Sequence, residues 1–180
     1  MVALLDYQEE KIEEIKQDPI RMHSYMEGMC IEIGNFLNLD TYTADPNAKY
    51  NNLPLSSIAT LDKLPPFTYE DILKTTKKID VLWFNDKGFL FPKRAIEIVD
   101  SIGTLDGSLK RTFQLIEFNL DFYILCKSDH INKVELELSR EPYKRVRHRY
   151  KVCSYDAIEE IYNSPISSQK NEFLKVESYF

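Results

Sequence analysis

The chain has 180 residues and a formal net charge of −6 at pH 7, a length typical of one domain with its own core. Its 43% hydrophobic and 29% charged residues are ordinary for a water-soluble protein. Net charge alone would not hold so acidic a chain on nucleic acid, because non-specific affinity comes from neutralised phosphates. Apolar runs are too short to span a membrane, and the three cysteines form no CxxC pair. We therefore expect a cytoplasmic protein without a membrane segment, a zinc site or a disulfide framework.

The N-terminal part predicts two helices. Residues 3–17 have the charged, amphipathic pattern of a peripheral helix, and Asp18-Pro19 has the cap and first-turn proline of a second helix. Glu27 and Glu32 are expected off the apolar stripe of this second helix. The stripe consists of apolar residues at three- and four-residue spacing: Met22, Met26, Met29, Ile33 and Leu37.

The next segment predicts little regular structure. A short strand is expected at 40–44. Residues 45–74 contain four prolines and mixed polarity, which indicates a long ordered loop with a helical turn near 69–73.

An antiparallel hairpin follows. Residues 79–84 and 89–101 are rich in strand-forming side chains, and the turn-forming residues 85–88 separate them. Beyond the hairpin, helices and strands alternate, with a buried strand whose helical connection favours parallel pairing. These later elements are a helix at 104–119, a strand at 122–126, a helix at 129–140, a strand at 152–153 and a helix at 155–163 capped by Ser154.

The order of elements predicts an α/β sandwich around a mixed sheet. We divide the chain into a peripheral N-terminal helix (1–20), a core domain (21–163) and a weakly helical or disordered tail (164–180).

Each arm of the hairpin carries an acid among apolar residues. Asp80 begins one strand and Glu97 lies at the centre of the other. On neighbouring strands two carboxylates can share one Mg²⁺ or Mn²⁺, which orients water and neutralises a phosphate. A salt bridge to Lys or Arg, or plain exposure, would also explain such acids.

A series of segments in this order resembles the restriction-endonuclease-like, PD-(D/E)XK nuclease superfamily. The resemblance runs from about His23 to Asn163, and the C-terminal segment is similar to uncharacterised bacterial and archaeal members. It implies a restriction-endonuclease-like sandwich in which helices flank a central mixed sheet. The segments are MEGMCIEIGNFLNLDTYTADPNAKY, KKIDVLWFNDKG, RAIEIVDS, SLKRTFQL, FYILCKSD and LSREPYKRV…YKVCSYDAIEEIYN.

The resemblance also implies site residues. Members of the superfamily bind metal through an Asp at the second core strand and an acid in the third, which match Asp80 and Glu97. A glutamate of the first core helix often contributes, for which Glu27 is preferred over Glu32. The implied cofactor is Mg²⁺ or Mn²⁺ and the implied partner is DNA.

One position departs from this pattern. The superfamily places a lysine, or sometimes Glu or Gln, two residues after the third-strand acid, where this chain has Val99. Either a lysine from elsewhere substitutes (Lys110, our candidate catalytic residue, or Lys93), or a bulge brings Asp100 into the site, or the domain no longer cuts.

Two further groups are candidates for contact with phosphate or the site. Arg111 and Gln114 follow the third strand on a predicted helix, where superfamily members carry supporting polar residues. The segment 143–151 is strongly basic and could grip a DNA backbone, or it could be ordinary solvated surface near acidic residues. Its cations are Lys144, Arg145, Arg147, Arg149 and Lys151.

The sequence therefore predicts a metal-dependent DNA endonuclease domain, from a restriction or phage-defence system. The alternatives are a catalytically inactive nuclease fold that binds DNA or a protein partner, and a subunit that completes its site with a second copy or another chain.

Overall fold

The computed structural model describes residues 13–164. Most of the predicted peripheral helix and the tail from 165 onward lie outside these residues, and within them 13–17 are helical. The first complete helix, α2 (Pro19–Phe36), begins where the sequence predicted. Asp18 caps it, because its carboxylate accepts hydrogen bonds from the backbone N–H groups of Ile20 and Arg21.

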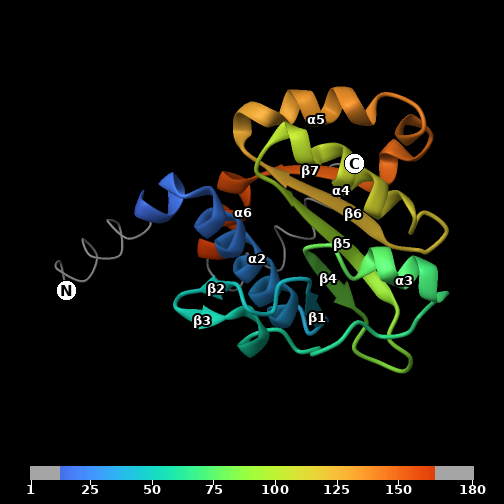
Figure 1. Cartoon of the computed structure of the whole chain (residues 1–180), viewed down its shortest axis with the longest axis horizontal. Coiled ribbons are helices and arrows are strands. Elements are labelled where there is room, and N and C mark those ends of the chain that lie inside the picture. Colours follow the sequence, from blue (N-terminus) through green and yellow to red (C-terminus); the bar gives the residue numbers. More distant parts are fainter. Residues whose placement is uncertain (1–12, 165–180) are drawn as a thin grey trace.

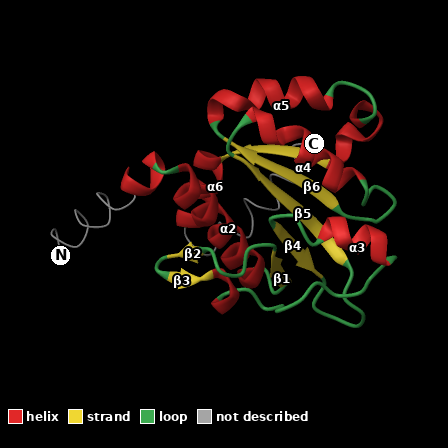
Figure 2. Cartoon of the chain, in the orientation of Figure 1, coloured by secondary structure: helices red, strands yellow, loops and turns green. Residues whose placement is uncertain are grey.

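A five-stranded mixed sheet forms the centre, in the order β1-β4-β5-β6-β7 (Figures 1 and 2). The first two pairs in this order are antiparallel, and β5, β6 and β7 run parallel to one another. The strands are β1 (Asp40–Thr43), β4 (Val81–Phe84), β5 (Pro92–Val99), β6 (Asp121–Cys126) and β7 (Tyr150–Ser154). The predicted hairpin and the predicted parallel pairing are both confirmed.

Helices cover both faces of this sheet and produce two cores (Figure 1). Side chains alternate along each strand, so Trp83 faces the core beneath α2 and α6 while its neighbours Leu82 and Phe84 face the core beneath α4 and α5. The helices are α3 (Glu70–Thr76), α4 (Ile102–Phe113), α5 (Ile131–Leu138) and α6 (Tyr155–Asn163). The chain is thus an α/β sandwich of the restriction-endonuclease-like kind, as predicted.

Two glycines let α2 approach the sheet closely. A Cβ added at Gly28 would lie 2.1 Å from the ring of Tyr50, and one at Gly34 would lie 2.6 Å from a methyl group of Thr41. The indole N–H of Trp83 also donates to the backbone carbonyl of Cys30 over 3.1 Å. These contacts fix α2 against β2 (Lys49–Tyr50), β1 and β4.

Several boundaries differ from the sequence prediction. The predicted loop 45–74 includes a small antiparallel sheet, β2 (Lys49–Tyr50) with β3 (Leu53–Pro54), and a 3₁₀ turn, η1 (Leu55–Ser57). The predicted helical turn near 69–73 is the longer α3. Two-residue strands have too little periodicity to stand out in a sequence.

The C-terminal half shows two more such differences. Helix α4 ends at Phe113 rather than at 119, and turns connect it to β6. The predicted helix 129–140 is a 3₁₀ turn, η2 (Ser128–His130), followed by α5, and a second 3₁₀ segment, η3 (Tyr143–Arg149), leads into β7.

Candidate metal centre

A polar cluster lies where α2 passes the start of β4 and the end of β5. His23 and Glu27 are four residues apart on α2 and therefore share one side of that helix. Asp80 directly precedes β4, and Asp100 directly follows β5. The antiparallel pairing of β4 with β5 places these two acids at the same end of the sheet.

Glu27 is the most unusual member of this cluster. Its side chain is 1% exposed, and its Oε2 atom has no hydrogen-bond partner among the described residues. The sequence pattern placed Glu27 off the apolar stripe, but the close packing of α2 buries it. Burial, together with the charges of Asp80 and Asp45, raises the pKa of Glu27 to about 8 against the opposing effect of His23. A buried carboxyl oxygen without a donor is costly unless a cation is present.

His23 supplies positive charge in the absence of a metal ion. Its Nδ1 atom is 2.6 Å from Oδ2 of Asp100, and its Nε2 atom is 3.7 Å from Oδ1 of Asp80. Burial alone would lower the pKa of His23, but the hydrogen bond with Asp100 and the nearby charge of Asp80 raise it to about 10. The protonated imidazole therefore neutralises part of the acidic cluster at neutral pH.

The two aspartates are held by donors from the surrounding fold. Oδ2 of Asp80 accepts a hydrogen bond from the backbone N–H of Ile98 over 2.7 Å. The hydroxyl of Tyr155, the first residue of α6, donates to Oδ1 of Asp100 over 2.7 Å. Each carboxylate thereby keeps its orientation toward His23.

The ligand atoms available in this cluster fit a divalent cation. One atom each from His23, Glu27 and Asp80 lies within 4.8 Å of the others. Two carboxylates favour Mg²⁺ or Mn²⁺, whereas an imidazole nitrogen favours later transition metals. If His23 loses its proton and binds the ion, these three residues suit Mn²⁺ better than Mg²⁺. If His23 turns away, the two carboxylates suit either ion.

Glu97 adjoins this cluster but has a partner of its own. Its side chain is fully buried, and the guanidinium of Arg111 on α4 donates to both carboxylate oxygens, through Nε to Oε1 over 2.7 Å and through NH2 to Oε2. Burial raises the pKa of Glu97 to about 7, and the contact with Arg111 limits that rise. The charge of Asp80 also acts on Glu97, so the two predicted acids are near each other.

The structure bears on two explanations for Val99, a bulge in the strand and a lysine supplied from elsewhere. Val99 is fully buried in the core beneath α4, and its pairing with Cys126 continues the regular register of β5 with β6. The strand therefore has no bulge at Val99, and Asp100 reaches the cluster because it directly follows the strand end. Lys110 is exposed and forms an ion pair of 2.7 Å with Asp106, and Lys93 lies at the other end of β5. Neither lysine contacts the cluster.

Two supporting candidates lie apart from the cluster. Glu32 accepts hydrogen bonds from the hydroxyls of Tyr50, over 3.0 Å, and Tyr162. Gln114 is exposed at the C-terminal end of α4. The preference for Glu27 over Glu32 is consistent with this arrangement, since only Glu27 belongs to the candidate ligand set.

Most cations of the basic segment 143–151 are paired with other groups of the same chain. Arg147 binds the carboxylate of Glu135 and the backbone carbonyl of Tyr150. Arg149 donates to the carbonyls of the turn after α4, and Lys151 is 7% exposed with Asp121 at 3.7 Å. Arg145 is exposed and pairs with Glu141, while Lys144 is exposed. Phosphate contact by this segment stays a prediction, with Lys144 and Arg145 the accessible cations.

Sequence reasoning missed His23 and Tyr155. The signal for His23 was present, because a histidine four residues before a glutamate lies on the same helix side. Tyr155 could not be found this way, since its contact with Asp100 joins residues 55 positions apart in the chain.

The fold and this cluster define a class, the restriction-endonuclease-like α/β sandwich with an acidic centre at one sheet end. A family model described as the type II restriction enzyme NmeDI C-terminal domain matches residues 4–178. The chain belongs to this family and is therefore related to restriction enzymes. No curated protein and no solved structure is significantly similar to it. Among residues 13–164, no helix has the length and apolar character needed to cross a bilayer.

Proposed function

We propose that this domain is a metal-dependent phosphodiesterase that cleaves DNA, with Glu27, Asp80 and Glu97 as the acids that hold Mg²⁺ or Mn²⁺. The observation that carries the proposal is the buried, unpartnered oxygen of Glu27 within reach of Asp80 and His23. Membership of a restriction-enzyme family supports DNA as the substrate. The PD-(D/E)XK assignment belongs to the same proposal, supported by the hairpin acids on β4 and β5.

In this proposal, Arg111 takes over part of the role that the superfamily lysine has elsewhere. When bound, the ion would polarise a water molecule and a phosphate oxygen. Glu97 would then exchange Arg111 for the ion, and the released guanidinium would neutralise the substrate phosphate. Arg111 is suited to this exchange because its side chain is 27% exposed, whereas that of Glu97 is fully buried.

The test compares two acids of the same helix. Isothermal titration with Mn²⁺ and Mg²⁺, and cleavage of plasmid and linear DNA, are measured for wild type, Glu27→Gln, Asp80→Asn and Glu97→Gln. We expect metal binding and cleavage in the wild type and loss of both in Glu27→Gln, Asp80→Asn and Glu97→Gln. Glu32→Gln is the matched control, because Glu32 bonds to tyrosines outside the cluster, and it should retain both activities.

A second candidate function is a domain that binds DNA or a protein partner without cutting. Val99 in place of the usual lysine and the Arg111–Glu97 pair favour it, because together they leave Glu97 neutralised without a metal ion. Wild-type protein that binds neither ion and leaves every substrate intact would eliminate the nuclease in favour of this alternative.

A further inference from the structure

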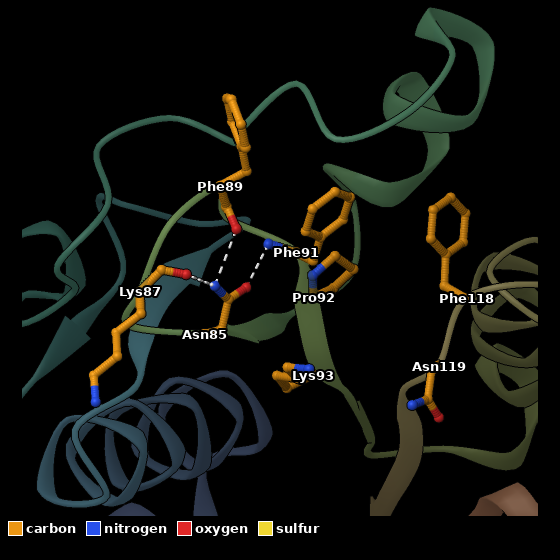
Figure 3. A pocket seen from close by; sticks show the side chains of 8 residues that line it. All are labelled: Asn85, Lys87, Phe89, Phe91, Pro92, Lys93, Phe118 and Asn119. Carbon is orange, nitrogen blue, oxygen red and sulfur yellow. Dashed lines mark hydrogen bonds between the residues drawn. The ribbon is translucent and has the colours of Figure 1, made fainter.

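A second site lies at the opposite end of the hairpin from the acidic cluster. The loop between β4 and β5 and the turn after α4 enclose a hollow of about 570 Å³. Figure 3 shows Phe91 on the hairpin and Phe118 and Asn119 on the turn at either side of the hollow, while the ring of Phe89 projects outward from the hairpin loop. None of these residues takes part in the candidate metal centre.

The aromatic side chains of this hollow are unusually accessible. Phe89 is 88% exposed and Phe91 is 49% exposed. The ring of Phe118 is fixed in position by Phe67, against which it packs edge-on at a centroid distance of 5.3 Å. Exposed rings gathered at one place indicate a binding surface, whereas a single exposed apolar residue does not.

The hairpin loop is held in shape by one side chain. The amide nitrogen of Asn85 donates to the backbone carbonyls of Lys87 and Phe89, and its oxygen accepts from the backbone N–H of Phe91 over 2.6 Å (Figure 3). The exposed rings therefore sit on a preformed loop, which lowers the entropic cost of binding a ligand there.

Two cations line the same hollow. Within residues 13–164, neither Lys87 nor Lys93 has a carboxylate partner, unlike Lys74 and Lys110, which form ion pairs on their own helices. Among residues 13–164, no acid lines this hollow. A neighbouring hollow that shares Lys93 does contain Asp86 and Asp121. The cations are therefore without acidic neighbours only in the hollow lined by the phenylalanines.

We propose that this hollow, the hairpin site (Lys87, Phe89, Phe91, Lys93 and Phe118), binds an unpaired nucleotide of a DNA strand. A flat base offers a face to aromatic rings whatever its identity, and the adjoining phosphates attract lysines. Lys93 and Glu97 are four residues apart on β5, about 13 Å along the strand, or roughly four base steps of a duplex. DNA bound at the acidic cluster would thus extend to the hairpin site, but the hairpin site requires no metal ion.

The experiment measures binding in EDTA, so that it is independent of the proposed nuclease activity. Fluorescence anisotropy reports the affinity of a twelve-nucleotide single strand and of a blunt duplex of the same sequence. Phe89→Ala with Phe91→Ala should bind the single strand about tenfold more weakly than wild type. Lys87→Ala with Lys93→Ala should lower the slope of log affinity against log salt by about 1.4, or 0.7 for each cation.

The matched control carries Lys133→Ala and Leu136→Ala on α5, an exposed cation and an exposed apolar residue away from the hairpin. This control should bind both probes as wild type does. A strand containing 2-aminopurine adds a direct readout, because stacking on a ring quenches its fluorescence. The quench should disappear in the phenylalanine variant.

Three results would overturn the proposal. The first is unchanged single-strand affinity and salt slope in both hairpin variants. The second is equal loss for the fully paired duplex, which has no free base to stack. The third is a wild-type dimer in sedimentation velocity that becomes a monomer in the phenylalanine variant while DNA affinity stays the same, because the hollow would then hold a second copy.

Discussion

Glu27 and Glu32 lie five residues apart on α2, yet their surroundings are opposite. Glu32 receives hydroxyl hydrogen bonds from Tyr50 and Tyr162. Glu27 is more deeply buried, and one of its oxygens receives no hydrogen bond from the described residues. A protein interior satisfies nearly all of its polar groups. The difference therefore separates an acid whose hydrogen bonds are made within the fold from one whose oxygen lacks a donor, which is why we propose Glu27 as a metal ligand.

The largest expected effect comes from metal-dependent stabilisation. Mn²⁺ at one hundred times its Kd should stabilise wild-type protein by about 2.7 kcal/mol, or roughly 5–10 °C in Tm. Glu27→Gln should abolish this shift in differential scanning fluorimetry, whereas Glu32→Gln should keep it. An equal Tm shift in both variants would remove the distinction between the two acids.

The arginines of the basic segment 143–151 allow the same comparison, between a side chain with several internal partners and an exposed one. Arg149 donates to the carbonyls of Ile116, Phe118 and Leu120, so Arg149→Ala should lower the free energy of unfolding by about 2.5 kcal/mol. Arg145 is exposed and pairs only with Glu141, so Arg145→Ala should cost about 0.5 kcal/mol or less. Urea denaturation measures both. Similar losses would show that internal partners do not distinguish these side chains.

The pH dependence of stability tests the state of Glu27. With a folded pKa of about 8 against an ordinary value of 4.5, Glu27 retains a proton that the unfolded chain releases between these values. In EDTA, the free energy of unfolding should therefore fall as pH rises from about 5 to 8, and then this contribution should level off. Glu27→Gln should remove that part of the slope and be more stable than wild type at pH 8.

This comparison isolates Glu27 from its neighbours. His23, Asp80, Asp100 and Asp45 also act on its carboxyl group and are present in both proteins. Parallel stability curves for wild type and Glu27→Gln between pH 5 and 8 would show that Glu27 ionises as an ordinary glutamate.

A small effect is expected at Glu32, whose carboxylate already has hydrogen-bond donors. Tyr162→Phe removes one of the two hydroxyls that donate to Glu32, and it should cost about 1 kcal/mol in urea denaturation without affecting metal binding. Loss of metal binding in this variant would place Glu32 and its tyrosines within the metal centre.

The sequence predicted the features that depend on local pattern. Asp18-Pro19 marked the start of α2, Ser154 marked that of α6, and the turn residues after Phe84 marked the hairpin that brings Asp80 toward Glu97. Each of these signals arises from neighbouring residues, so no knowledge of the packed structure is needed.

The site itself depended on distant contacts. The burial of Glu27 follows from Gly28 and Gly34, which bring α2 against Tyr50 and Thr41. The pairing of Glu97 with Arg111 and the anchoring of Asp100 by Tyr155 join separate elements. Helical periodicity described α2 as an isolated amphipathic helix and could not show how close the sheet would come.

Trp83, the single tryptophan of the chain, is a natural optical reporter for this arrangement. Its indole is fully buried and donates to the carbonyl of Cys30 on α2, the helix that carries His23 and Glu27. Any separation of α2 from β4 would admit water to the indole and shift its emission to longer wavelength. Docking of the helix that completes the acidic cluster can thus be followed in unlabelled protein, in real time, by fluorescence alone.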